Sequence, residues 1–361
     1  MTVEPANIAD VPAVIVQQEG RLGSLTLNRA KTLNALTLPM IRGMAQALDA
    51  WRTTTEVETV LIEGSGRAFC AGGDIRAVYE SATAGSDEAA ELWREQYLLN
   101  ATIVDYPKPV VTILDGITMG GGVGLGCHAS HRIVTENAVL AMPEVSIGLA
   151  PDVGGLLLLA RAPGEVGTHL ALTAGKIRAA DALYCGLADD HVASSQLDAL
   201  RAALVRRPVD EAIEAVRTPP GQREAPPLAG ERAWIDASYG GDDVTPILHR
   251  LAARPEPQAQ EAATALSEVS PLGATVCLRA LRTAAELDDE RAVFAQDYRV
   301  TVRFLDTHDL AAGIKSAIIT KDRSPSWQPA RFTDVTTDMV DRHFQSLGDR
   351  ELFDPDTSVA S

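Results

Sequence analysis

Apolar residues near the N-terminus follow first a strand spacing and then a helix spacing. Two short β-type runs, AVIVQQ and GSLTLN, lie within residues 11–28 on either side of a glycine-containing turn, which predicts a β-hairpin. Thr37 is a residue type that caps helices, and Pro39 would lie in the first turn. The helix that they begin is predicted from apolar positions at helical spacing, namely Leu38, Ile41, Met44, Leu48 and Trp51.

The next segments repeat one order of strand, glycine-rich turn and helix. VETVLIEG (57–64) predicts a buried strand and is followed by GSGRAFCAGGDIR; a charged stretch at about 86–103 predicts a helix. KPVVTILDG (108–116) predicts another buried strand. The small residues of MGGGVGLGCHASHRIV then indicate the tightly packed start of a helix. This repetition predicts an α/β fold.

Strand patterns fade beyond GTHLALTAG. IRAADALYCGLAD predicts a helix that ends at Gly186, and much of 196–316 is rich in Ala, Leu and Glu. TPPGQREAPPLAG (218–230) has the composition of a linker between two helical blocks. The predicted organisation is a core at 11–205, a helical C-terminal region of the same unit at 206–347, and a tail at 348–361.

Composition narrows the class of protein. Hydrophobic residues make up 46% of the 361 residues, charged residues 22%, and the net charge is −17. These values are typical of a globular protein, and the charge argues against a nucleic-acid partner, because phosphate contacts need clustered Lys and Arg. Four separated cysteines without a CxxC pair favour free thiols over a metal or redox site. The N-terminus lacks a signal-peptide pattern, and no apolar run approaches membrane-spanning length, so a cytoplasmic location and no membrane partner are predicted.

Several motifs of known chemistry are absent. The chain has no GxGxxG in register, no GxxxxGK[ST], no GxSxG and no HExxH, and His128 with His131 lacks a third ligand, so no metal is expected. Two glycine-rich turns remain, at 71–74 and 120–122. Backbone N–H groups of such turns suit an oxyanion that develops on a carbonyl. Tight packing of helix on strand is the alternative, and the pattern alone favours it.

AMPEVSIGLAPDVGG (141–155) holds two acids, Glu144 and Asp152, in an otherwise apolar run. Charged side chains are uncommon in such a run unless something pairs with them or uses them. From the residues alone, Glu144 is a helix-start carboxylate and Asp152 a turn residue more readily than either is catalytic.

The longer motifs resemble a known family. RAFCAGGDI (67–75), GITMGGGVGL (116–125) and the segment at 141–155 closely resemble the crotonase superfamily of acyl-CoA enzymes, and NRAKTLNAL (28–36) matches its N-terminal signature. Within it, CAGGDIR, ITMGGGVGL, PDVGG, residues 308–330 and SLGDRELF most resemble the 3-hydroxyisobutyryl-CoA hydrolase branch. The resemblance spans nearly the whole chain. It implies a crotonase-like spiral of ββα units with a mainly helical C-terminal region, and it makes a homo-oligomer an open possibility.

The resemblance also implies an activity. It is hydrolysis of a short 3-hydroxyacyl-CoA thioester, in particular 3-hydroxyisobutyryl-CoA from valine breakdown, with coenzyme A as part of the substrate and no cofactor. Crotonase-type hydratases use two glutamates. The first of these positions is Gly124 here, and the second matches Glu144. A hydratase or isomerase that uses Glu144 alone is therefore disfavoured, and an inactive acyl-CoA-binding homologue is the other alternative.

Residue roles carry over by the same resemblance. The N–H groups of Gly73 and Gly121 would form the oxyanion hole. Glu144 would act as nucleophile or general base, and Asp152 would orient it, bind the 3-hydroxyl or move a proton. Two nearby carboxylates in an apolar site should displace each other's pKa, so that one keeps a proton near neutral pH.

The remaining candidates are for substrate contact. Gln96 stands where close relatives have a glutamate, and Gly72, Gly120 and Asp74 accompany it, although an Asp after two glycines readily bonds the backbone of its own turn. Cations in or near the matched segments are candidates for binding coenzyme A, namely Arg29, Lys31, Arg67, Arg76 and Lys321.

Overall fold

The computed structural model describes residues 12–287 and 289–353. The predicted tail is thus described only to residue 353, and residues 1–11 of the N-terminal segment lie outside the described residues. The hairpin prediction is confirmed: β1 (Val14–Glu19) pairs antiparallel with β2 (Leu22–Leu27). Helix α1 (Leu38–Arg52) follows with Pro39 in its first turn. Thr37 occupies the N-cap position, but its side chain makes no cap hydrogen bond, so burial of one helix face stabilises α1 instead.

Two sheets arise from one repeated unit. Each unit sends its first strand to a six-stranded sheet of order β1-β2-β3-β5-β7-β10 and its second to a four-stranded sheet of order β4-β6-β8-β9. The first unit contains β3 (Thr59–Gly64) and β4 (Ala68–Cys70), and the second contains β5 (Val110–Leu114) and β6 (Ile117–Met119). The third contains β7 (His131–Val134) and β8 (Val139–Ala141). Strands from successive units are parallel, which is the spiral of ββα units that the family resemblance implied.

Helices follow the second strand of each unit. They are α2 (Ile75–Ala84) and α3 (Glu88–Val104), α4 (Gly121–Cys127), and a 3-10 turn η3 (Glu144–Ile147) with α5 (Gly155–Ala160). The sequence predicted α3 and the start of α4 but not α2. Only Val78 and Ser81 are buried on α2, so it lacks the apolar stripe that marks a helix in sequence.

The C-terminal part is helical, as predicted. After α6 (Val166–Thr173) come the short β9 (Lys176–Arg178), α7 (Ala179–Tyr184), which is followed by Gly186 with φ +73°, and β10 (Asp190–His191). The remaining helices are α8 (Leu197–Leu204), α9 (Val209–Glu214), α10 (Pro227–Tyr239), α11 (Val244–Ala252), α12 (Pro257–Glu268), α13 (Pro271–Glu286), α14 (Glu290–Arg303), α15 (His308–Ile314) and α16 (Thr337–Phe344). The division into 11–205 and 206–347 stays a prediction.

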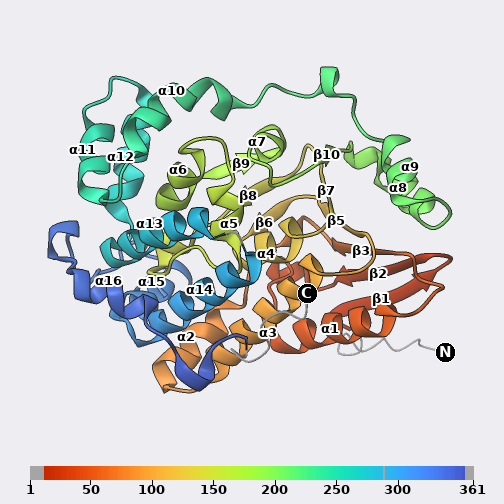
Figure 1. Cartoon of the computed structure of the whole chain (residues 1–361), viewed down its shortest axis with the longest axis horizontal. Coiled ribbons are helices and arrows are strands. Elements are labelled where there is room, and N and C mark those ends of the chain that lie inside the picture. The colour runs from red at the N-terminus through yellow and green to blue at the C-terminus, as the bar shows by residue number, and fades with distance from the viewer. Residues whose placement is uncertain (1–11, 288, 354–361) are drawn as a thin grey trace, which may run out of the picture.

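The predicted linker is shorter than expected. Residues 218–226, with a 3-10 turn at Pro220–Gln222, run across the surface from α9 to α10 (Figure 1). Pro227–Gly230 instead form the first turn of α10, because proline is tolerated where the backbone N–H has no helical partner.

The C-terminal helices return to the spiral core. Helix α14 lies against α3 and α5, and α15 lies against α2 and η3 (Figure 1). The contact with η3 is backbone on backbone: a Cβ added at Gly313 would lie 2.4 Å from the carbonyl oxygen of Ile147, and one added at Gly148 would lie 2.2 Å from that of Asp309. Helix α15 is therefore held closely against the turn that carries Glu144.

Candidate active site

One cavity gathers the predicted site residues. Its volume is about 120 Å³. The loop before α2, the starts of α4 and η3, one face of α3, the segment after η3 and α15 all contribute to its wall. The wall is formed by Ala71, Gly72, Gly73, Ile75, Val78, Trp93, Gln96, Gly120, Gly121, Pro143, Glu144, Ile147, Leu149, Asp152, Leu310 and Ile314.

Two backbone N–H groups lie in the wall of this cavity, on neighbouring turns. A parallel bridge between Leu36 and Gly73 uses the carbonyl of Gly72 and the N–H of Asp74, so the N–H of Gly73 points to the opposite side. Gly121 is the first residue of α4, where an N–H has no partner within the helix. The turns touch, because a Cβ added at Gly121 would lie 3.1 Å from the nitrogen of Gly73. This is the arrangement that an oxyanion hole requires.

Gln96 supports the second of these turns. It is buried on α3, and its Nε2 donates to the carbonyl oxygen of Gly121 at 3.1 Å. A Cβ added at Gly121 would lie 2.4 Å from the same Nε2. The amide of Gln96 therefore contacts the turn at Gly121 directly. An ionised carboxylate at this position could not donate the same hydrogen bond.

We expect Gln96→Met to lower kcat/KM about fivefold to tenfold, because it removes a buried hydrogen bond to the oxyanion turn while preserving volume. Steady-state kinetics measures the change. Gln260→Met is the matched control, since the Nε2 of Gln260 donates to the carbonyl of Ala252 at 3.1 Å, away from the cavity. An equal loss in both variants would contradict a specific role for Gln96.

Glu144 and Asp152 are both buried in the cavity wall, each with 5% of its surface exposed. Burial raises the pKa of Asp152 to about 7. Burial also raises the pKa of Glu144 well above its usual range, and the negative charge of Asp152 adds to that effect. The pair therefore keeps one proton near neutral pH, as the sequence predicted for two close carboxylates.

The carboxylate of Glu144 lies directly against the glycine-rich turn at residues 120–122. A Cβ added at Gly120, which has φ +51°, would lie 2.5 Å from Oε1 of Glu144, so only glycine fits there. Oε2 of Glu144 is buried and has no hydrogen-bond partner among the described residues. A buried acceptor of this kind is available to a substrate or to the water that attacks it.

No side chain fits at Gly124, the position of the first glutamate in hydratases. A Cβ added there would lie 2.5 Å from Cγ2 of Val153 and 2.7 Å from Nδ2 of Asn100. The space that a second hydratase carboxylate would need is therefore filled by the loop that carries Asp152.

Of the five cations predicted to bind coenzyme A, one forms an ion pair and four are exposed. Arg29 forms an ion pair with Asp74 at 3.5 Å and donates to the carbonyl of Ala35 at 2.6 Å. Lys31, Arg67, Arg76 and Lys321 are exposed. The carboxylate of Asp74 makes no cap hydrogen bond to its own turn, which corrects the prediction, and Asp74 is not part of the cavity wall. The Arg29 ion pair takes up that carboxylate.

Several residues of the site region carried no signal that the sequence reasoning used. Leu310 and Ile314 reach the cavity from about 160 residues further along the chain than Asp152. Tyr97, Asn100 and Asp297 surround the Asp152 loop. The signal that would have found Tyr97, Asn100 and Asp297 is a polar residue on the buried face of a predicted helix, since buried polar groups need partners.

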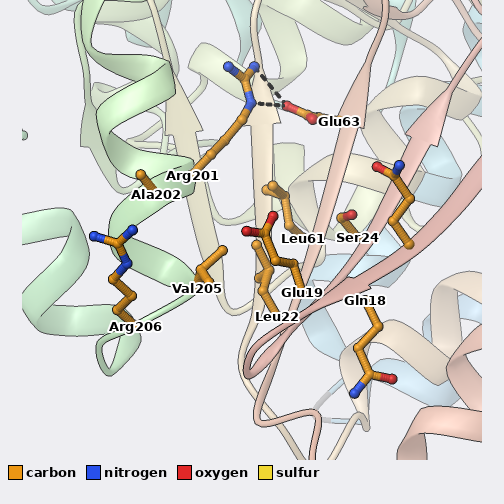
Figure 2. A pocket seen from close by; sticks show the side chains of 11 residues that line it. Gln18, Glu19, Leu22, Ser24, Leu61, Glu63, Arg201, Ala202, Val205 and Arg206 are labelled. Atoms are coloured by element: carbon orange, nitrogen blue, oxygen red, sulfur yellow. Dashed lines mark hydrogen bonds and ion pairs between the residues drawn. The ribbon is translucent and has the colours of Figure 1, made fainter.

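A second hollow, about 470 Å³, lies between the β1–β2 hairpin and α8 (Figure 2). Figure 2 shows Arg201 directed at Glu63, with which it pairs at 2.8 Å. No pair of buried carboxyls lines this hollow. Across residues 12–287 and 289–353, no three His, Cys, Asp or Glu side chains cluster as a metal site would require, and no helix has the length and apolar character to span a membrane.

Comparison with known families places the fold. The enoyl-CoA hydratase/isomerase family matches residues 22–344. The chain belongs to this family. Its fold is the crotonase fold that the resemblance implied. This family member is 36% identical to 3-hydroxyisobutyryl-CoA hydrolase, mitochondrial, from Danio rerio and 35% identical to that of Homo sapiens, over 94% of the chain and 91% and 90% of those proteins.

Solved structures of family members superpose closely. A carnitinyl-CoA dehydratase from Mycobacterium thermoresistibile is 44% identical with a TM-score of 0.91 over 94% of this chain and 98% of its own. An enoyl-CoA hydratase from Rhodobacter sphaeroides is 39% identical with a TM-score of 0.88 over 95% of this chain and all of its own. The names of these relatives cover more than one reaction class, so the site geometry has to distinguish them.

Proposed function

We propose that this chain hydrolyses the thioester of a short 3-hydroxyacyl-CoA, specifically 3-hydroxyisobutyryl-CoA. One observation carries the proposal: two buried carboxyls face the same small cavity as two backbone N–H groups, while Val153 and Asn100 fill the space beside Gly124. The names of the curated relatives support the same substrate. Coenzyme A is part of this substrate, and we propose no separate cofactor.

The reaction needs a polarised carbonyl, an attacking oxygen and a proton for the departing thiolate. The N–H groups of Gly73 and Gly121 stabilise the negative charge on the carbonyl oxygen. The ionised member of the Glu144–Asp152 pair takes a proton from water as the C–O bond forms, and the protonated member gives its proton to sulfur as the C–S bond breaks. The pair thus still holds one proton, now on the other carboxyl, and transfer of that proton within the pair or exchange with water restores the starting state.

Direct attack by Glu144 is the other route. Its carboxylate would form a mixed anhydride with the acyl group and expel the thiolate, and water would then open the anhydride. The contact of Glu144 with Gly120 suits both routes, because Gly120 adjoins the oxyanion turn.

Hydration of a double bond is the competing reaction class, favoured by the names of the two solved structures. It needs proton transfer at two carbons, for which crotonase-type hydratases use two glutamates. Gly124 cannot carry one without displacement of Val153, and Asp152 comes from a different loop. Hydrolysis uses the acids that are present.

The deciding experiment is a thiol-release assay with 3-hydroxyisobutyryl-CoA beside a hydration assay with crotonyl-CoA. We expect free thiol to appear in the first assay and little loss of the conjugated double bond in the second. Hydration without thiol release would overturn the proposal. Absence of both activities would also overturn it and would favour a protein that binds acyl-CoA without catalysis.

We further propose that the protein works in the cytoplasm and as a homo-oligomer. The first proposal rests on the four cysteines, which are free, buried thiols and suit a reducing compartment. The curated relatives are named as mitochondrial and so lend it no support. Cell fractionation and light scattering test these two points.

The wall formed by α15 should limit the length of the acyl group. Ile314 lines the cavity with no exposed surface, and the backbone of α15 packs closely on that of η3 at Gly313. We expect Ile314→Ala to raise kcat/KM for a six-carbon relative to a four-carbon 3-hydroxyacyl-CoA about tenfold, because it adds apolar space. Ile247→Ala in α11, also fully buried, is the control for general loss of packing. An unchanged ratio in Ile314→Ala would contradict the prediction.

A further inference from the structure

The loop that carries Asp152 has a backbone conformation that its sequence does not favour. Val153 has φ +55°, and Gly154 has φ +79°. A β-branched residue with positive φ is a genuine outlier, because its Cβ crowds the backbone. Strain of this kind persists only where surrounding contacts hold it, and it is concentrated at functional sites.

Polar side chains of α3 and of the residue that follows α4 hold this loop. The N–H of Val153 donates to the hydroxyl of Tyr97 at 2.8 Å. The carbonyl of Val153 accepts from Nε2 of His128 at 3.1 Å and from Nδ2 of Asn100 at 3.3 Å. Every backbone polar group of the strained residue is thus bonded to a side chain rather than to another part of the backbone.

Asp297 holds the next residue. Its Oδ2 accepts the N–H of Gly154 at 3.0 Å, and it lies on α14 with 1% of its surface exposed. Its Oδ1 is buried with no hydrogen-bond partner among the described residues. Burial, with the charge of Asp152 adding to it, raises the pKa of Asp297 well above its usual range, so a neutral amide is a close substitute. A buried acid is costly, and no catalytic step proposed above uses this one.

We propose that Tyr97 and Asp297 are positioning residues that hold Val153 and Gly154 in the left-handed conformation and thereby present Asp152 to the cavity. The inference rests on the proposed hydrolase function. Tyr97 is itself held by the hydroxyl of Thr301 at 3.1 Å and by edge-to-face packing on Phe294 and Tyr298 of α14. The same helix therefore supplies Asp297 and fixes Tyr97.

The test compares kcat and KM for 3-hydroxyisobutyryl-CoA in Asp297→Ala, Asp297→Asn and Tyr97→Phe. Asp297→Ala and Tyr97→Phe should each lower kcat about tenfold to a hundredfold with KM changed less than about threefold, because a small misplacement of a reacting group is costly and the acyl-CoA contacts remain. Asp297→Asn should restore kcat to within about threefold of the wild type, because its side-chain oxygen still accepts the N–H of Gly154.

Two buried groups of the same chemistry lie outside the site and serve as controls. Asp181 accepts the N–H of Leu228 at 2.9 Å, and the hydroxyl of Tyr239 bonds Nδ1 of His169 at 2.8 Å. Asp181→Ala and Tyr239→Phe should leave kcat of the folded protein unchanged. Equal losses in the controls, or wild-type kcat in Tyr97→Phe, would overturn the inference. Tyr97→Phe decides the matter if Asp297→Ala does not fold.

Amide hydrogen exchange separates this inference from the proposed function. The amides of Val153 and Gly154 should exchange slowly in the wild type and at least about tenfold faster in Tyr97→Phe and Asp297→Ala respectively. If the wild-type protein released no thiol, the proposed function would be wrong, but the exchange rates of the Val153 and Gly154 amides would still test the positioning role. Unchanged exchange in both variants would defeat the positioning role even in an active enzyme.

Discussion

Glu144→Gln is expected to lower kcat at least about 1000-fold while acyl-CoA affinity changes less than about threefold. Glutamine has the same shape but can neither attack a thioester, take a proton from water nor give one to sulfur, so the loss should fall on the chemical step. The side chain is buried beside Gly120, and an uncharged amide is more readily accommodated there than a carboxylate. Thiol release measures kcat, and calorimetry with a non-hydrolysable acyl-CoA measures affinity.

Glu63→Gln is the matched control, because Glu63 is a partly buried glutamate that pairs with Arg201 in the hollow of Figure 2, outside the site. It should keep wild-type turnover. Turnover by Glu144→Gln within about tenfold of the wild type would remove Glu144 from the mechanism. In a single turnover in heavy-oxygen water, label in the Glu144 carboxylate would demonstrate a mixed anhydride opened on the enzyme side, whereas absence of label excludes that direction of opening alone.

Asp152→Asn is expected to raise the free energy of unfolding at pH 8 by roughly 4 kcal/mol while abolishing most activity. Burial raises the pKa of Asp152 from its usual 3.8 to about 7 in the folded protein, and that difference corresponds to roughly this free energy. A group whose pKa is raised on folding stabilises the protein at low pH. That stability is lost as the pH rises from about 4 to about 7. Asparagine cannot ionise, so the free energy of unfolding of Asp152→Asn should increasingly exceed that of the wild type as the pH rises from about 4 to about 7.

Urea denaturation of the wild type and Asp152→Asn at pH 4, 6 and 8 measures this advantage. The two proteins should be nearly equally stable at pH 4, which serves as the internal control. A difference that does not change with pH would mean that packing, and not ionisation, distinguishes them. In the same variant the pKa of Glu144 should fall, because the charge that helped to raise it is gone.

The fold was largely predictable from local pattern and motif. The hairpin, α1 and the buried strands β3 and β5 follow from apolar spacing, α3 from a charged helical stretch, and the helical C-terminal part from its content of Ala, Leu and Glu. The short strands β4, β6 and β8 and the helix α2 did not, because runs of three residues carry no measurable period and α2 buries little. Pro227 was read as part of a linker, because a proline that begins a helix and one that ends a segment have the same local composition.

For the site as well, the residues that lie in contiguous motifs were predictable, and the properties that depend on their surroundings were not. The oxyanion turns, Glu144 and Asp152 lie in contiguous motifs, and the cavity gathers them together with Gln96. Asp74 and the cations were named from proximity in sequence, and the structure places Asp74 in an ion pair with Arg29 instead. The sequence predicts only that two close acids displace each other's pKa. The upward shift of the pKa of both Glu144 and Asp152 follows mainly from burial, which no local pattern reports.

The sequence by itself determined the family, the two glycine-rich turns and the identity of the two acids, because each depends on residues that are neighbours in the chain. Only the tertiary structure decided that Val153 fills the space at Gly124, that Leu310 and Ile314 close the cavity, and that Tyr97 and Asp297 hold the Asp152 loop. These contacts join segments from about 30 to more than 150 residues apart. Such contacts depend on how the turns of the spiral core and the C-terminal helices pack together, which spacing along the chain does not encode.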